Sequence, residues 1–195
     1  MAHALMRVGV LSLLGAAAAA ALAAAAQRPG PASAAQAIVP QQSTLVASFR
    51  QEAVTVDAPF KRFDGSIHYD PAHADETRAT LHVDTSSLDI GDEDSDAEVR
   101  GASWFDSAHY PTATFESTHI VPRDAQHFDA TGNLTIKGRT RPVTVNVGVA
   151  PAAHGFSYDG SFELSRRDFG IGDPQWDSVL DDHVRVRFHL LADGG

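Results

Sequence analysis

The sequence has no cysteine among its 195 residues. This absence excludes disulfide bonds, a thiol nucleophile, cysteine-based zinc sites and a lipid-modified cysteine terminus. Motifs of other enzyme classes are also missing, because there is no G-x-S-x-G elbow, no glycine-rich phosphate loop and no Walker lysine. We therefore predict a protein without catalytic residues or a cofactor, whose fold is held by the packing of its core.

Basic residues are scarce relative to acidic ones. The chain has 15 Lys and Arg against 25 Asp and Glu, which gives a net charge of −10 at pH 7. Arg7 and Arg28 are the only charged residues among the first 34, so the remainder carries 13 basic against 25 acidic residues, a net charge of −12. Such a surface repels nucleic acid and anionic lipid headgroups, and no nucleic-acid partner is expected.

Long hydrophobic runs are absent except near the N-terminus, where residues 8–26 carry no charge and A-x-A patterns follow at 24–26 and 32–34. This arrangement is typical of a secretory signal peptide, although the run is also long enough for a retained membrane anchor. The run is dominated by Ala and precedes plausible cleavage sites. We therefore expect residues 1–34 to be a signal peptide and lead-in and residues 35–42 a flexible linker. The mature protein would be periplasmic or secreted, without stable membrane insertion.

Apolar and polar residues alternate with a period of two in the rest of the chain. Eight segments show the pattern, at residues 44–49, 66–69, 80–84, 113–118, 133–137, 143–149, 156–165 and 184–190. Each would form a strand with one apolar and one polar face, and turn residues such as Asp70-Pro71 and Lys137-Gly138 lie between them. The pattern predicts an all-β protein, an antiparallel barrel or sandwich of about eight strands.

One acidic stretch interrupts the alternation. Ser95 and Glu98 have the spacing of a capping box, which predicts a short helix over about 94–102. Asp92, Asp94 and Asp96 also match positions 1, 3 and 5 of a calcium-binding EF-hand loop. That loop, however, needs Gly where Ala97 stands and Glu where Ser103 stands. We therefore favour a solvated helix start over a calcium site.

The ten histidines show no His-x-His pair and no His-Glu-x-x-His run, so we predict no metal site. His82, His119 and His189 fall on the expected polar faces of strands. The interior of an eight-stranded barrel is either filled by side chains or just wide enough for one small ligand. The alternation alone does not distinguish a filled from a hollow barrel.

Four ordered motifs add a family resemblance. The segments are W-F-D-S-A-H-Y-P-T-A-T-F-E-S-T at 104–118, G-N-L-T-I-K-G-R-T-R-P-V at 132–143, R-D-F-G-I-G at 167–172 and D-H-V-R-V at 182–186. Together they resemble the YceI-like domain family, which binds polyisoprenoids. The chain departs from the family pattern where Ala47 matches a usual Phe and where Ala58 matches a usual Gly.

The resemblance implies a lipocalin-like extended barrel over residues 43–191 with one short helix. It also implies a carrier that holds an apolar isoprenoid lipid, such as a quinone tail, in a cavity without a cofactor. The alternative is a stress-related or surface-interaction module with a side-chain-filled barrel, and a homodimer is compatible with either. The ligand-binding residues that the resemblance implies are Phe49, Leu81, Val83, Trp104, Phe105, Phe115, Leu134, Ile136, Phe162, Phe169 and Phe188.

Overall fold

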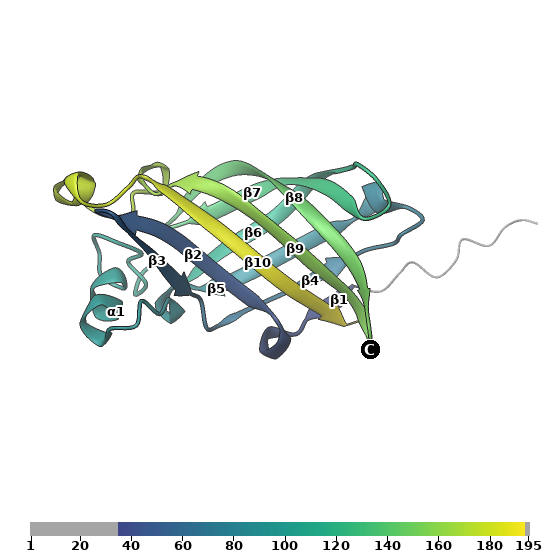
Figure 1. Ribbon diagram of the computed structural model, residues 1–195, viewed down its shortest axis with the longest axis horizontal. Coiled ribbons are helices and arrows are strands. Elements are labelled where there is room, and N and C mark those ends of the chain that lie inside the picture. The colour runs from purple at the N-terminus through teal and green to yellow at the C-terminus, as the bar shows by residue number, and fades with distance from the viewer. Residues whose placement is uncertain (1–34, 194–195) are drawn as a thin grey trace, which may run out of the picture. The chain divides into compact units, whose positions relative to one another are not determined.

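The computed structural model describes residues 35–193. This part of the chain forms ten β-strands, one α-helix and five short 3₁₀ helices (Figure 1). The α-helix is α1, Glu93–Val99. The strands are β1 (Gln36–Ile38), β2 (Thr44–Gln51), β3 (Val54–Pro59), β4 (Phe63–His68), β5 (Arg78–Asp84), β6 (Thr112–Pro122), β7 (His127–Ile136), β8 (Arg139–Ala152), β9 (Gly155–Ser165) and β10 (His183–Asp193). The 3₁₀ helices are Pro40–Gln42, Ala74–Glu76, Thr85–Ser87, Arg167–Phe169 and Pro174–Ser178.

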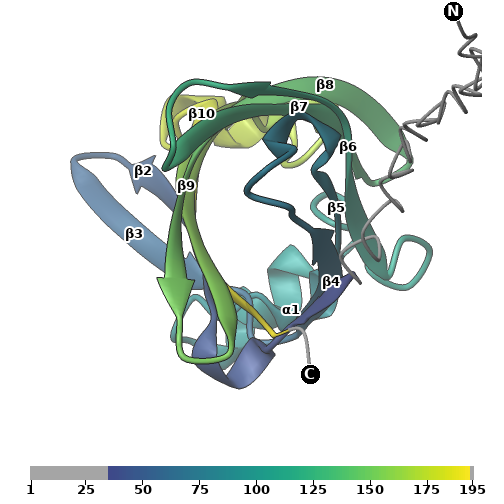
Figure 2. The ribbon, with the colours of Figure 1, turned by 90° about the vertical axis from the view of Figure 1, so that its right-hand side faces the viewer.

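Eight of the strands close into a ring. The order is β1-β4-β5-β6-β7-β8-β9-β10, with antiparallel neighbours. The ring closes where β1 pairs with β10, placing Ala37 opposite Asp193 and Ile38 opposite Ala192. Figure 2 shows the strands arranged around a common axis. The predicted antiparallel barrel with one short helix is therefore confirmed, and a closed ring removes the sheet edges that would otherwise invite pairing with other chains.

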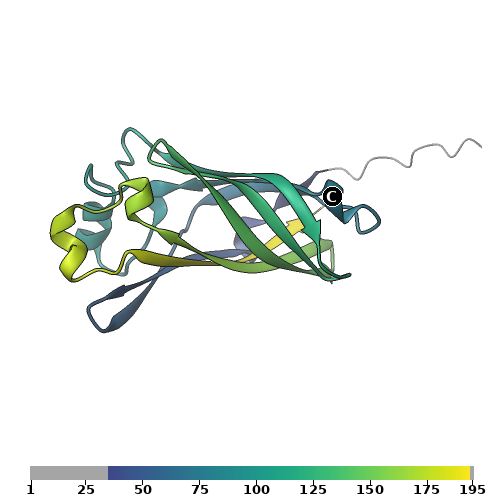
Figure 3. The ribbon, with the colours of Figure 1, turned by 90° about the horizontal axis from the view of Figure 1, so that it is seen from above.

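The β2–β3 hairpin lies outside this ring. β2 pairs with residues 185–189 of β10, on the same side of that strand as β1 but nearer its start. β1 and β2 are thus one strand interrupted by the 3₁₀ turn Pro40–Gln42. β3 pairs with β2 alone among the described strands, and the hairpin leans away from the barrel wall (Figure 3).

The expected flexible linker at 35–42 is wrong. Gln36 and Ile38 are buried, and β1 is hydrogen-bonded between β4 and β10. The Ser43 hydroxyl reinforces the following turn, donating to the Val39 carbonyl at 2.8 Å and accepting from the Leu191 N–H at 2.9 Å. A composition rich in Ala, Pro and Gln does not reveal a three-residue strand that only its neighbours stabilise. The predicted signal peptide lies outside the described residues.

Helix α1 is shorter than expected and begins differently. Its N-cap is Asp92, whose carboxylate accepts hydrogen bonds from the N–H and hydroxyl groups of Ser95 at 3.0 and 2.8 Å. A capping box would require Ser95 to be the N-cap residue. Ser95 instead lies inside the helix. Val99 is the buried residue of α1. No helix within residues 35–193 has the length and hydropathy needed to cross a membrane.

A candidate ligand cavity inside the barrel

The barrel encloses an apolar cavity of about 330 Å³. Its wall is made by the inward faces of the ring strands and of β2, and by the segment from Leu88 to Phe105. A volume of this size lies at the lower end of the range of small-molecule sites. The barrel is therefore hollow rather than filled by its own side chains.

Two glycines explain why the centre stays open. Phe115 and Phe188 face inward yet are only half-buried, and the tips of their rings lie against glycines of the neighbouring strands. A Cβ at Gly160 would lie 2.4 Å from Phe188 Cζ, and one at Gly132 would lie 2.5 Å from the Phe115 ring. Each glycine thus provides the space into which an aromatic ring settles.

The predicted ligand-binding residues lie on this wall with one exception. Phe169 is 1% exposed and packs in the core, but it does not line the cavity. It ends a 3₁₀ helix that turns back through Gly170 in the left-handed conformation. The predicted residues that do line the cavity are Phe49, Leu81, Val83, Trp104, Phe105, Phe115, Leu134, Ile136, Phe162 and Phe188.

One end of the barrel, which we call the α1 end, carries α1, the loop to β6 and the 3₁₀ helix Pro174–Ser178 (Figure 1). Trp104 and Trp176 both line the cavity there, with ring centroids 5.6 Å apart. Phe60 meets Phe105 edge-on at 6.1 Å. A second small core lies beneath these rings and includes Ala47 and Ala58, the two positions that depart from the family pattern.

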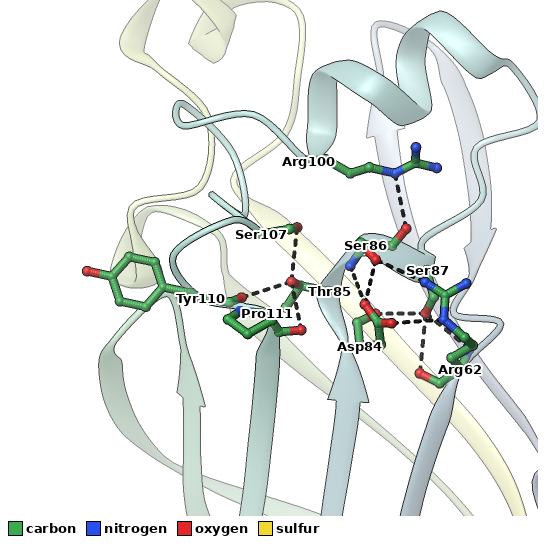
Figure 4. A network of polar contacts seen from close by, with 9 residues as sticks. All are labelled: Arg62, Asp84, Thr85, Ser86, Ser87, Arg100, Ser107, Tyr110 and Pro111. Carbon is green, nitrogen blue, oxygen red and sulfur yellow. Dashed lines mark hydrogen bonds and ion pairs between the residues drawn. The ribbon is translucent and has the colours of Figure 1, made fainter.

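A polar network fixes the α1 end to the strands (Figure 4). Asp84, at the end of β5, accepts hydrogen bonds from Arg62 Nε at 2.8 Å and from the Ser86 hydroxyl at 2.7 Å. Arg100, just after α1, donates from Nε to the Ser86 carbonyl at 3.1 Å. The fully buried Thr85 hydroxyl donates to the Tyr110 carbonyl at 2.9 Å.

The electrostatics of Asp84 follow from this network. Burial raises the pKa of its carboxyl group, but the hydrogen bonds from Ser86 and Arg62 outweigh that effect, so the pKa lies below its ordinary value. Asp84 is therefore held as a carboxylate that positions the strand end, the following 3₁₀ helix and, through Ser86, the end of α1.

Arg166 is a buried cation at the rim that the sequence analysis missed. It is 2% exposed, and its guanidinium donates to the carbonyls of Asp181, Ile171 and Leu180 at 3.0–3.2 Å. It also pairs with the Asp177 carboxylate at 2.6 Å. These bonds join the end of β9 to the loop before β10, so Arg166 shapes the rim. Its position directly before the quoted R-D-F-G-I-G motif was the available signal.

Tyr158 is the second missed residue and lies toward the other end of the barrel, the far end. It stands in β9 between Val149 of β8 and Leu190 of β10. It is 1% exposed and lines the cavity. Its ring meets Tyr69 edge-on at 5.9 Å, and burial raises the pKa of its hydroxyl.

His82 and His189 lie on the outer face of the barrel, as expected. His82 contacts Asp64 at 3.0 Å and His189 contacts Asp159 at 2.7 Å, both between neighbouring strands. Within residues 35–193, no three His, Asp or Glu side chains are placed to share a metal ion. The chemistry of the described interior is thus apolar, with isolated polar groups at the rim and the far end.

An antiparallel barrel around an apolar cavity defines a lipocalin-like class of small-molecule-binding proteins. The model of the YceI-like domain matches residues 37–192. The chain therefore belongs to the YceI-like domain family, and its predicted membership is confirmed.

Known proteins agree with this assignment. A UPF0312 protein of Vibrio cholerae is 33% identical over 133 residues, which are 65% of this chain and 70% of the relative. The crystal structure of Burkholderia cenocepacia BcnA has 35% identity and a TM-score of 0.76, covering 78% of this chain and 98% of BcnA. A polyisoprenoid binding domain from Saccharophagus degradans shares the fold at 16% identity, with a TM-score of 0.65 over 80% of this chain and 97% of that domain.

Proposed function

We propose that this protein is an exported carrier that holds an isoprenoid lipid, such as a quinone with its tail, inside the barrel. The observation that carries the proposal is the apolar cavity of about 330 Å³ bounded by the inward faces of the strands. The Saccharophagus degradans domain of the same fold is described as polyisoprenoid-binding, which supports this ligand class.

Binding of a lipid by such a carrier requires neither a cofactor nor proton transfer, because burial of the lipid in the cavity supplies the favourable free energy. Burial of a methylene group contributes about 0.8 kcal/mol. About ten carbons in the lumen therefore contribute about 8 kcal/mol, from which the cost of ordering the ligand is subtracted. The hollow wall is already in place, so little protein rearrangement opposes binding.

Export is part of the proposal and rests on the sequence. The uncharged run at 8–26 and the A-x-A patterns support removal of a signal peptide, and the barrel would then act in the periplasm or outside the cell. In the described sheet, β3 keeps one unpaired edge, which would support the homodimer. Fractionation of cells and sedimentation of the purified protein test these two points.

The ligand is tested by organic extraction of the purified protein followed by mass spectrometry. We expect a prenyl lipid from the wild type and a reduced amount from Leu134→Trp, because the larger ring fills the lumen. Asn133→Trp is the matched control, since Asn133 is the exposed neighbour on the outer face of β7, and it should retain the lipid. A clean extract from the wild type, with no rise in melting temperature on adding a long-chain quinone, would favour the surface-interaction module instead.

A further inference from the structure

Tyr158 has a buried hydroxyl group without a protein partner. The side chain lines the apolar cavity, yet no group within residues 35–193 forms a hydrogen bond with its oxygen. Thr77, another hydroxyl-bearing residue of the lining, already donates to the Ala74 carbonyl at 2.7 Å. The Tyr158 hydroxyl is thus a donor that faces apolar surroundings.

Burying a hydroxyl group without a hydrogen bond destabilises a folded protein. Phe at this position would keep the edge-on contact with Tyr69 and would avoid that cost. The Tyr158 hydroxyl therefore has a use that packing does not explain. Its oxygen is buried, and a partner from outside the protein would have to enter through the cavity, which the Tyr158 side chain lines.

The position of Tyr158 places this donor deep in the barrel. Val184, near the start of β10, packs against the same small core as Trp104, at the α1 end. Leu190, six residues further along the same strand, stands opposite Tyr158. At about 3.3 Å per residue the two levels are about 20 Å apart. Phe128 and Tyr69 fill the wall around Tyr158 and stack on each other at 6.2 Å.

We propose that the Tyr158 hydroxyl donates a hydrogen bond to an oxygen atom of the carried lipid. Accordingly, the lipid enters with its oxygen-bearing end first, and this end is an uncharged carbonyl or hydroxyl group. An ionised group would be buried without a counter-charge, because the cavity residues at this level are apolar or hydroxyl-bearing. This inference rests on the proposed function and specifies which end of the ligand is buried deepest.

The test compares farnesol with the hydrocarbon in which its hydroxyl group is replaced by hydrogen. We expect the wild type to bind farnesol about tenfold more tightly, a ratio typical of one buried hydrogen bond. Tyr158→Phe should lose this preference and bind farnesol no more tightly than the hydrocarbon, because the hydroxyl group of farnesol would then be buried without a partner. Tyr69→Phe removes the hydroxyl group of the adjacent ring, which does not line the cavity, and should keep the preference.

Two further measurements distinguish a hydrogen bond from Tyr158 to the ligand from a structural role of the Tyr158 hydroxyl. The carbonyl stretch of bound farnesylacetone should shift to lower frequency in the wild type and in Tyr69→Phe, but not in Tyr158→Phe. Without ligand, Tyr158→Phe should melt no lower than the wild type, because the hydroxyl group has no protein partner to lose; a large drop would assign it a structural role and overturn the inference.

Trp104 provides a contrast, because its indole Nε1 is the other buried donor without a partner on the described cavity wall and lies at the α1 end. If Trp104→Phe rather than Tyr158→Phe abolishes the preference for farnesol, the oxygen lies at the α1 end and the inference is wrong. Equal wild-type affinity for both probes overturns this inference alone. Failure of the wild type to bind either probe overturns the proposed function as well.

Discussion

At the scale of single residues, the hollow interior depends on which side chains are absent. Gly160 and Phe188 stand opposite each other in β9 and β10, and the ring occupies the space that a Cβ would need. Aromatic rings thus form the wall of the cavity instead of filling it. The backbone of Gly160 has no unusual φ value, so the requirement for glycine here comes from packing.

Gly160→Ala should therefore push the Phe188 ring toward the lumen. We expect a loss of about 1–3 kcal/mol in unfolding free energy, as for other overpacked cores, and weaker ligand retention. Gly148→Ala is the matched control, because a Cβ there would have no neighbour nearer than 3.7 Å. Urea denaturation measures both, and equal stability of the two variants would contradict the explanation.

A second prediction at this scale separates two adjacent arginines that share one carboxylate. Arg166 and Arg167 both contact Asp177 Oδ1, at 2.6 and 3.2 Å, but the former is buried and the latter exposed. Arg166→Met should lose about 3 kcal/mol or more of stability, because its buried acceptors lose their donor. Arg167→Met should lose less than about 1 kcal/mol. Both losses are measured by chemical denaturation. Similar losses for the two variants would show that burial of the guanidinium does not determine how much it stabilises the fold.

At the scale of elements, the α1 end is attached to the strands by polar contacts that depend on one carboxylate. Asp84 ends β5, contacts Arg62 directly and binds Ser86, whose carbonyl accepts from Arg100 beyond α1. α1 itself is seven residues long and buries only Val99. So short a helix needs its neighbours for stability.

The lowered pKa of Asp84 gives this attachment a pH dependence of known sign. A carboxyl group whose folded pKa lies below its unfolded value stabilises the fold above the unfolded pKa, and this contribution is lost as the pH falls through the folded pKa. The melting temperature should thus fall on acidification below the ordinary value of 3.8. Asp84→Asn should be less stable at neutral pH and less sensitive to acid. Glu116→Gln, at an exposed site on β6, is the control and should follow the wild type.

At the scale of the whole molecule, the sequence predicts the long strands of the barrel, but it does not predict β1, the short strand that closes the ring. The alternation of Leu81 and Val83 or of Val184 and Val186 identifies strands with one apolar face, and all eight predicted strands exist. β1 is too short to show a period. β3 begins with exposed residues such as Val54, so its alternation is weak. β1 is stabilised by pairing with β4 and β10, which are distant in sequence, whereas β3 pairs with the adjacent strand β2.

The candidate site is predictable to a similar degree. Inward-facing positions on the strands follow from strand periodicity, which is why the predicted residues on strands line the cavity. Trp104 and Phe105 also line it but lie in the loop before β6, where only the family resemblance indicated them. Periodicity cannot show that the Tyr158 hydroxyl lacks a partner or that Arg166 is buried. Those properties depend on how β9, β10 and the connecting loop meet in three dimensions.

The pairing of β1 with β10 joins residues 37–38 to residues 192–193, the two ends of the domain. Contacts so distant in sequence form late, since a long loop must close first. A chain that is still being synthesised lacks β10, and its barrel is therefore not yet closed. The same would hold for a chain part-way through a translocation channel if the protein is exported as proposed. On the proposed function, lipid can be retained only after the C-terminal strand β10 has paired with β1, because before that step the wall of the cavity is open.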